Sequence, residues 1–262
     1  MKEELYLYLT GTAGAGKSSL TRGFDTWLRQ RGLDAIKVNL DPGATSLPYT
    51  PDVDIRDWVA LEEIMAEHGL GPNGAQIAAA DMVALNLKEV KDAIDDYKTD
   101  YVIVDTPGQV ELFVFRQAGK VIVETLNPGR SMVAFLLDPA LSRTPSSFVS
   151  QLLLTNTVHY RLHTPMVAVL SKKDLLSPED EETIRNWASD ADALYEALSN
   201  EGRGDEDGGT VQALPTELLR ALGDIGGFHK LISTSSDTLE GIDDLYVSLQ
   251  RAFLGGEDTM SD

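Results

Sequence analysis

The stretch "GTAGAGKS", residues 11 to 18, decides the fold. It matches the pattern Gly-x-x-x-x-Gly-Lys-Ser, and it lies between a short apolar run and a helical period. A glycine-rich turn at such a junction lets backbone N–H groups surround a phosphate, and the following helix points its positive end at the same anion. The stretch therefore predicts a phosphate-binding loop in an α/β protein.

Each part of this loop has an expected role. Gly11, Gly14 and Gly16 should take positive φ angles so that the backbone can approach the phosphate closely. Lys17 should bridge the β- and γ-phosphates, and the Ser18 hydroxyl should ligate Mg²⁺. The remaining nucleotide-binding positions of the loop are Thr12, Ala13, Ala15 and Ser19. A glycine turn that only caps a helix is the alternative, but it does not explain the Lys-Ser pair after the loop.

Apolar runs alternate with longer helical periods along the rest of the chain, as they do in βαβ units. The strands are nearly continuous apolar runs, which is typical of a parallel sheet covered on both faces. Six strands are predicted, at residues 5–10, 35–40, 101–105, 132–138, 166–171 and 229–234. Helices are predicted near 17–31, 56–68, 75–97, 112–125, 146–162, 178–200, 215–222 and 240–254. The pattern indicates a doubly wound, mainly parallel sheet of the P-loop NTPase type.

The chain is expected to form one domain over residues 1–262, since α/β folds of this length are common. A helical insertion is predicted near 178–225, between the fifth and sixth predicted strands. Within it, "EGRGDEDGG" (201–209) is charged and rich in glycine, which is typical of a mobile surface loop. The tail at 255–262 is also expected to be flexible.

Composition excludes several classes of function. The 22 Lys and Arg against 42 Asp and Glu give a net charge of −20, which repels nucleic-acid backbones and argues against direct nucleic-acid binding. There is no cysteine, so disulfides and thiolate metal sites are excluded. The four histidines have no spacing suited to zinc. No apolar run is long enough to span a membrane, and we expect a soluble, cytoplasmic protein.

A second motif, "VIVDTPGQVE" (102–111), ends a predicted strand with an aspartate and turns at once. In a phosphate-loop enzyme this aspartate, Asp105, lies near the metal and should hold a Mg²⁺-bound water. Gly108 can offer its N–H to a γ-phosphate. The Gln109 amide can both donate and accept, which suits it to orient an attacking water. An ordinary turn after a buried strand is the alternative.

A third motif, "VNLDPG" (38–43), also ends a strand with an aspartate. Residues after the carboxyl ends of the strands face the ligand crevice of an open α/β sheet. Asp41 is therefore a candidate to orient or activate the attacking water, or to contact the metal region. The residues do not choose among these roles, nor do they exclude a plain turn.

Base selection is predicted from "VLSKKD" (169–174), which resembles the guanine-reading Asn/Thr-Lys-x-Asp element of GTPases. The Asp174 carboxylate can accept hydrogen bonds from two donors on guanine that adenine does not present. The stem of Lys172 can lie over the base. Ser171 stands where many GTPases have Asn. The later "STSSDTLEGIDDLY" (233–246) resembles the segment whose backbone contacts the guanine oxygen, and Ser235 and Ser236 are the best candidates there.

The stretch "GLGPNGA" (69–75) lies between two predicted helices and is richer in Gly, Pro and Asn than a plain connection needs. Together with the other motifs, in this order, it resembles the GPN-loop GTPases over residues 5 to about 254. The resemblance implies a GTPase that dimerises around its nucleotides, with Gly71, Pro72 and Asn73 of one subunit reaching the partner's phosphate site. The neutral Asn73 amide would then act as a sensor supplied in trans. A helix–helix turn is the structural alternative.

The resulting interpretation is a Mg²⁺-dependent GTPase that acts as a homodimeric switch. Eukaryotic relatives in this family are tied to RNA polymerase assembly, so the resemblance also suggests RNA polymerase subunits or assembly factors as partners. Without a long C-terminal extension, the chain is similar to the compact, homodimeric archaeal form. Two alternatives are a kinase for a small molecule or nucleotide, and a scaffold that binds nucleotide without turnover.

Overall fold

The computed structural model describes residues 4–201, 213–224, 227–228 and 230–254. Its centre is a seven-stranded sheet with strand order β3-β2-β4-β1-β5-β6-β7, in which every pair of neighbours is parallel. The strands are β1 (Leu5–Gly11), β2 (Ala35–Asn39), β3 (Val53–Asp54), β4 (Tyr101–Asp105), β5 (Ser131–Leu137), β6 (Met166–Leu170) and β7 (Leu231–Ser233). The predicted doubly wound α/β fold is confirmed.

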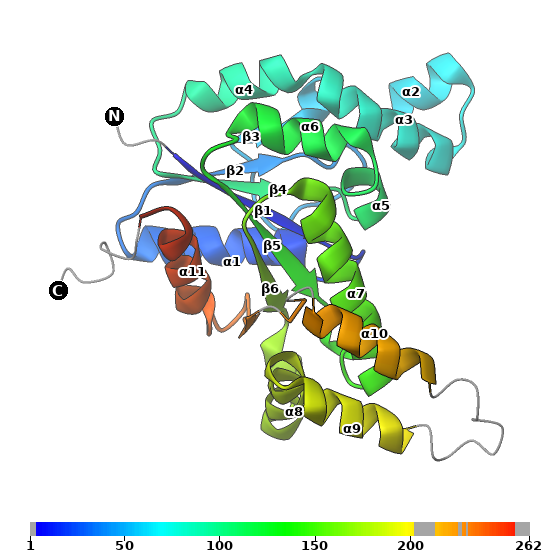
Figure 1. The fold of residues 1–262 in the computed structure, drawn as a ribbon. Coiled ribbons are helices and arrows are strands. Elements are labelled where there is room, and N and C mark those ends of the chain that lie inside the picture. The colour runs from blue at the N-terminus through cyan, green and yellow to red at the C-terminus, as the bar shows by residue number, and fades with distance from the viewer. Residues whose placement is uncertain (1–3, 202–212, 225–226, 229, 255–262) are drawn as a thin grey trace.

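Helices cover both faces of this sheet (Figure 1). The α-helices are α1 (Lys17–Gln30), α2 (Leu61–His68), α3 (Pro72–Leu85), α4 (Leu87–Asp95), α5 (Val110–Phe113), α6 (Gln117–Leu126), α7 (Pro145–Leu162), α8 (Pro178–Ser189), α9 (Ala191–Glu201), α10 (Ala213–Asp224) and α11 (Ile242–Leu254). Short 3₁₀ turns are η1 (Ile55–Asp57), η2 (Pro139–Leu141) and η3 (Lys173–Leu175).

Alternating side chains of the strands enter two separate hydrophobic cores. On one face, Leu7 and Leu9 of β1 pack with Phe24 of α1 and Leu249 of α11. On the other face, Tyr8 belongs to the core formed with α3 to α7. All seven residues of β1 are buried, as expected for a central strand between two layers of helices. The buried sheet thus positions the loops that follow the carboxyl ends of its strands.

Several predicted elements differ from the structure. The helix predicted at 112–125 is two helices, α5 and α6, and the helix predicted at 178–200 is also two, α8 and α9. β3 is a seventh strand that the prediction missed, because only two residues pair with β2 and they offer too short a pattern to recognise. The predicted helix at 75–97 is two helices that meet at Asn86. The Asn86 side chain donates to the carbonyl of Met82, which competes with helix continuation and ends α3 there.

The start of α3 also differs from the prediction, since the helix begins at Pro72 rather than after the GPN stretch. Proline suits the first helical position because it needs no N–H there. Gly69 ends α2 in the left-handed conformation, with φ 60°. The turn between α2 and α3 is therefore short, and Asn73 lies in the first turn of α3.

The predicted helical insertion is present as α8, α9 and α10, between β6 and β7. The residues predicted as a mobile loop, apart from Glu201 at the end of α9, and those of the predicted tail, lie outside the described residues. Among the helices that the structure describes, none is long and apolar enough to cross a bilayer.

Candidate functional site

The phosphate loop connects β1 to α1 at the centre of the carboxyl edge of the sheet. Gly11, Gly14 and Gly16 have φ angles of 152°, 79° and 96°, as the sequence predicts. A side chain at Gly11 would in addition place its Cβ only 2.6 Å from the carbonyl oxygen of Leu136 on β5. Glycine is thus required at this position both by the backbone angle and by the neighbouring strand.

The Lys17 amino group lies inside this loop and is almost fully buried. Its Nζ donates to the carbonyl oxygens of Gly11, at 2.9 Å, and Thr12, at 3.0 Å. It also donates to the carbonyl oxygen of Gly108, at 3.0 Å, which links the loop to the second motif. Burial lowers the pKa of Lys17, while the carboxylates of Asp105 and Asp41 act in the opposite direction.

Asp105 ends β4 directly beside β1, and only 1% of it is exposed. Its Oδ2 accepts a hydrogen bond from the Tyr49 hydroxyl at 2.9 Å, whereas its Oδ1 has no hydrogen-bond partner among the described residues. Burial raises the pKa of Asp105 to about 6; the hydroxyls of Ser18 and Tyr49 and the charge of Lys17 partly oppose this shift. A buried carboxylate oxygen without a partner among the described residues is suited to accept from a bound donor or to face a cation.

Ser18 and Asp105 fit a magnesium ion that is completed by other ligands. Mg²⁺ prefers oxygen donors and is commonly held by one or two protein groups together with waters and substrate phosphates. Within the described part of the chain, no group of three His, Cys, Asp or Glu side chains could hold a metal by itself. Waters and a substrate phosphate would complete the coordination of such an ion.

Asp41 meets the second motif, although it follows a different strand. Its Oδ2 accepts from the backbone N–H of Gly108 at 3.1 Å, and its Oδ1 accepts from the N–H of Gly43 at 2.9 Å. Gln109 is exposed at the start of α5, and its amide lies 3.5 Å from the Gln76 side chain of α3. The N–H of Gly108, which is predicted to donate a hydrogen bond to the γ-phosphate, is thus hydrogen-bonded to Asp41 in this structure.

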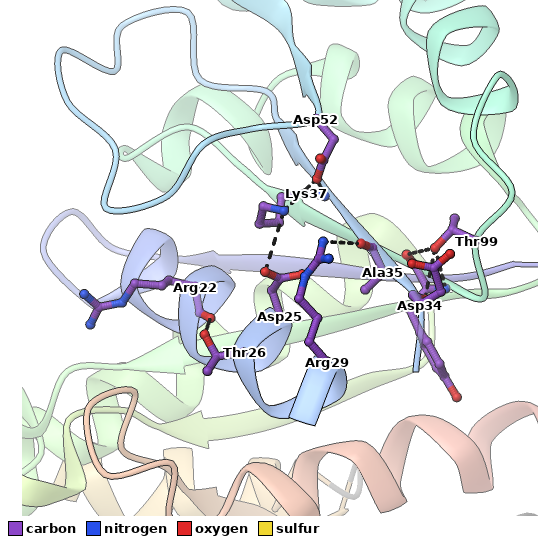
Figure 2. A network of polar contacts seen from close by, with 10 residues as sticks. Arg22, Asp25, Thr26, Arg29, Asp34, Ala35, Lys37, Asp52 and Thr99 are labelled. Atoms are coloured by element: carbon purple, nitrogen blue, oxygen red, sulfur yellow. Dashed lines mark hydrogen bonds and ion pairs between the residues drawn. The ribbon is translucent and has the colours of Figure 1, made fainter. Parts of the chain in front are cut away.

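The loop of residues 40–52 carries both Asp41 and Tyr49, and side chains hold it at both ends. At its start, Asn39 contacts both Asp41 and Asp54. At its end, Asp52 accepts from the Lys37 amino group at 2.7 Å (Figure 2). Lys37 also reaches toward Asp25 of α1, with 3.6 Å between the charged atoms. The loop is thereby anchored to α1 and to β2 beside the phosphate site.

The "SKKD" segment lies on the other side of the phosphate loop. The Ser171 hydroxyl donates to the carbonyl oxygen of Ala15 at 2.6 Å, and a Cβ at Gly16 would lie 3.6 Å from Cε of Lys172. The Lys172 amino group pairs with Asp138, at 2.9 Å. Asp174 is exposed in η3, and its carboxylate makes no hydrogen bond within the described residues. The predicted base-reading carboxylate is thus free to accept donors.

The candidate serines after β7 adjoin this segment. The carbonyl oxygen of Thr234 accepts from the N–H of Lys173 at 3.0 Å. The Ser235 hydroxyl is buried and accepts from the N–H groups of Asp237 and Thr238, so it holds its own turn together. Ser235 therefore shapes this turn through its side chain, which leaves backbone groups as the available contacts for a base.

Comparisons with known proteins agree with this arrangement. A protein-family model described as "Conserved hypothetical ATP binding protein" matches residues 9–254. "GPN-loop GTPase PAB0955" of Pyrococcus abyssi is 36% identical over 196 residues, which cover 74% of this chain and 77% of that protein. Its crystal structure in apo form matches with a TM-score of 0.83 and 30% identity, covering 95% of this chain and 98% of that chain.

This chain belongs to the GPN-loop GTPase family. "GPN-loop GTPase 1" of Dictyostelium discoideum is also 30% identical over 203 residues. Those residues are 76% of this chain, which spans only half the length of the Dictyostelium protein.

The stretch that gives GPN-loop GTPases their name is exposed in this structure. Gly71, Pro72 and Asn73 lie at the end of α3 that adjoins α2, at the periphery of the fold (Figure 1). The Asn73 side chain forms no hydrogen bond with the described residues. Gln76, one turn further along α3, packs near Gly43 and Gln109. The predicted sensor is therefore available to a group from outside its own chain.

The sequence did not identify three polar residues that lie at this site: Asp138, Tyr49 and Gln76. Asp138 follows β5 with the same Asp-Pro pattern as Asp41, a signal that could have identified it. Tyr49 and Gln76 have no such signal, because their positions depend on how a loop and a helix fold back over the sheet edge.

Proposed function

We propose that this protein is a Mg²⁺-dependent GTPase that hydrolyses GTP to GDP and phosphate. The observation that carries the proposal is the buried Lys17 amino group, which touches both the phosphate loop and Gly108. A lysine surrounded by three carbonyl oxygens at the start of a helix is placed to exchange these acceptors for phosphate oxygens. Membership of the GPN-loop GTPase family supports the same activity.

Different residues of the chain then bind the phosphates and position the attacking water. Lys17 and the N–H groups of the phosphate loop neutralise charge on the β- and γ-phosphates. The N–H of Gly108, which donates to Asp41 in this structure, donates to the γ-phosphate instead once nucleotide is bound. Once released, Asp41 can orient the attacking water together with Gln109. The chemistry is positioning and electrostatic stabilisation rather than covalent catalysis.

Ser18 and Asp105 would hold the magnesium ion, Ser18 through its hydroxyl and Asp105 through a bound water. When bound, the ion supplies positive charge that stabilises the charge developing between the β- and γ-phosphates. The unpartnered Oδ1 of Asp105 supports this assignment, because a water bound to a cation would satisfy it.

Guanine is the proposed base, although the matching family description names ATP. The Asp174 carboxylate is exposed and makes no hydrogen bond with the described residues, and guanine, unlike adenine, offers it two donors. Lys172 and the turn of Ser235 and Ser236 complete the proposed base site. A Cβ at Gly16 would lie 3.6 Å from Cε of Lys172, and this proximity supports a base site beside the phosphate loop.

We further propose that GTP and GDP change the shape of a homodimer in the cytoplasm, with Asn73 of each subunit reaching the other's phosphate site. The exposed position of Asn73 supports this reading. The family resemblance extends the proposal to assembly of RNA polymerase or another protein complex. Capture from host lysate with protein loaded with GDP or with a non-hydrolysable GTP analogue tests that role, and the same partners in both states would contradict a switch.

Phosphate release from GTP tests the proposed activity, with wild-type protein compared with Lys17→Ala and Lys120→Ala. Lys120 is a partly exposed lysine of α6 that pairs with Glu124, away from the phosphate loop, so its loss controls for the change of charge. We expect turnover in wild type and in Lys120→Ala, and none in Lys17→Ala or without Mg²⁺. A small molecule that accelerates GDP formation would indicate a kinase. Turnover no faster than in buffer would indicate a scaffold.

A further inference from the structure

The contact between Tyr49 and Asp105 joins two residues that are 56 positions apart. Asp105 is buried at the end of β4, and Tyr49 comes from the loop of residues 40–52 above the sheet edge. The Tyr49 hydroxyl donates to Oδ2 of Asp105 at 2.9 Å, while Oδ1 stays without a partner. The two oxygens of this carboxylate are therefore in different environments.

A carboxylate at a strand end does not fix its own orientation. The last torsion of an aspartate side chain is broad and roughly two-fold, so its plane is set by its hydrogen bonds. The hydroxyls of Ser18 and Tyr49 both hydrogen-bond to Asp105 and lower its pKa, and the Tyr49 hydroxyl donates to Oδ2 at 2.9 Å. The tyrosine hydroxyl therefore engages Oδ2 and favours the carboxylate orientation that leaves Oδ1 available.

The loop is built to keep Tyr49 in place. It reads "LPYTP" (47–51), so a proline lies on each side of Tyr49 and restricts the neighbouring backbone. One end is held by Lys37 through Asp52, as Figure 2 shows. Tyr97 adds a hydrogen bond from its hydroxyl to the carbonyl oxygen of Asp52, at 3.0 Å. The hydroxyl of Tyr49 is thus supported by a stiff and anchored segment.

We propose that Tyr49 is a positioning residue for Mg²⁺: its hydroxyl holds Oδ2 of Asp105, and leaves Oδ1 to accept a hydrogen bond from the metal's water. This inference rests on the proposed function. Groups that orient a metal-binding side chain typically change metal affinity by about 10- to 100-fold when they are removed. The same loop also holds Asp41, which accepts from the N–H of Gly108. Tyr49 and Asp41 therefore link the proposed metal site to the proposed γ-phosphate site through one loop.

The test compares Tyr49→Phe with Tyr97→Phe in the full chain. Both substitutions remove one hydroxyl from the anchoring of the same loop, but only Tyr49 contacts Asp105. The measurement is the release rate of fluorescently labelled GDP at increasing free Mg²⁺, and in EDTA. Phenylalanine keeps the ring, and thermal unfolding of each variant confirms that it folds.

We expect wild type and Tyr97→Phe to need the same Mg²⁺ concentration for half-maximal slowing of release, and Tyr49→Phe to need about tenfold more. Release in EDTA should be the same in all three proteins. An unchanged Mg²⁺ requirement in Tyr49→Phe, or an equal shift in Tyr97→Phe, would overturn the inference alone. If wild-type release did not respond to Mg²⁺, the magnesium part of the proposed function would fail as well.

Discussion

The carboxylate of Asp41 accepts a hydrogen bond from the backbone N–H of Gly108, with 3.1 Å between the two atoms. The same glycine accepts from the Lys17 amino group through its carbonyl oxygen. Groups that are proposed to bind the γ-phosphate are thus bound to one another in this structure. An entering triphosphate has to replace the Asp41 carboxylate, because two anions at one donor repel each other.

Replacing Asp41 with alanine should separate binding from hydrolysis. We expect GTP hydrolysis to fall by roughly 100-fold, the scale of a residue that positions or activates a water. Affinity for a non-hydrolysable GTP analogue should not fall, because a competing negative charge is removed. Asp57→Ala, an exposed aspartate in η1, controls for the change in net charge. Equal losses of affinity and turnover in Asp41→Ala would contradict the exchange at Gly108.

Asp105 gives the stability of the nucleotide-free protein a pH dependence. Burial raises the pKa of Asp105 to about 6, above its ordinary value of 3.8, so the native state binds this proton more tightly than the unfolded chain does. The ionised carboxylate therefore destabilises the native state above about pH 6, and this cost is lost as the pH falls toward 4. A raised carboxylate pKa thus favours unfolding at neutral pH.

Asp105→Asn should relieve that cost. Without nucleotide or Mg²⁺, we expect it to increase the free energy of unfolding by on the order of 2 kcal/mol at about pH 8, with a smaller gain at about pH 5. Denaturant unfolding at the two pH values measures this difference. The same variant should lose the Mg²⁺ dependence of GDP release. A gain in stability that did not change with pH would argue against a raised pKa.

Asn73 can be tested for action in trans by mixing two impaired variants. Asn73→Ala keeps an intact phosphate loop but lacks the sensor, and Lys17→Ala keeps the sensor but cannot bind nucleotide. If Asn73 acts on the partner's site, a mixed dimer has one complete site, and hydrolysis should exceed the sum of the two variants assayed separately. Activity that stays at that sum would place the effect of Asn73 within its own chain.

Much of this arrangement was predictable from the sequence because it depends on strand ends. The positive φ angles of Gly11, Gly14 and Gly16 follow from the phosphate-loop pattern, and Asp41 and Asp105 follow neighbouring parallel strands, whose carboxyl ends meet at one edge. Sequence patterning also predicts both layers of helices, since the strands are apolar on both faces.

The rest depends on contacts that no local pattern encodes. The Ser171 hydroxyl reaches Ala15, 156 positions away, and this contact appears only after β6 and the phosphate loop are placed side by side. The Tyr49 contact requires the folded path of an irregular loop. β3 has just two paired residues, and α3 starts at Pro72 because proline suits a first helical turn as well as it suits a loop.

The selectivity of hydrolysis for GTP over ATP tests the central claim most directly. It is measured as kcat/KM for each nucleotide in wild type, in Asp174→Ala and in Glu179→Ala. Glu179 is an exposed acid near Asp174 in the sequence, so Glu179→Ala controls for the loss of a negative charge. The account predicts a preference for GTP of at least about 100-fold in wild type and in Glu179→Ala, lost in Asp174→Ala, because Asp174 accepts two hydrogen bonds that only guanine donates. Equal use of ATP and GTP by wild type, or a preference that survives Asp174→Ala, would contradict it.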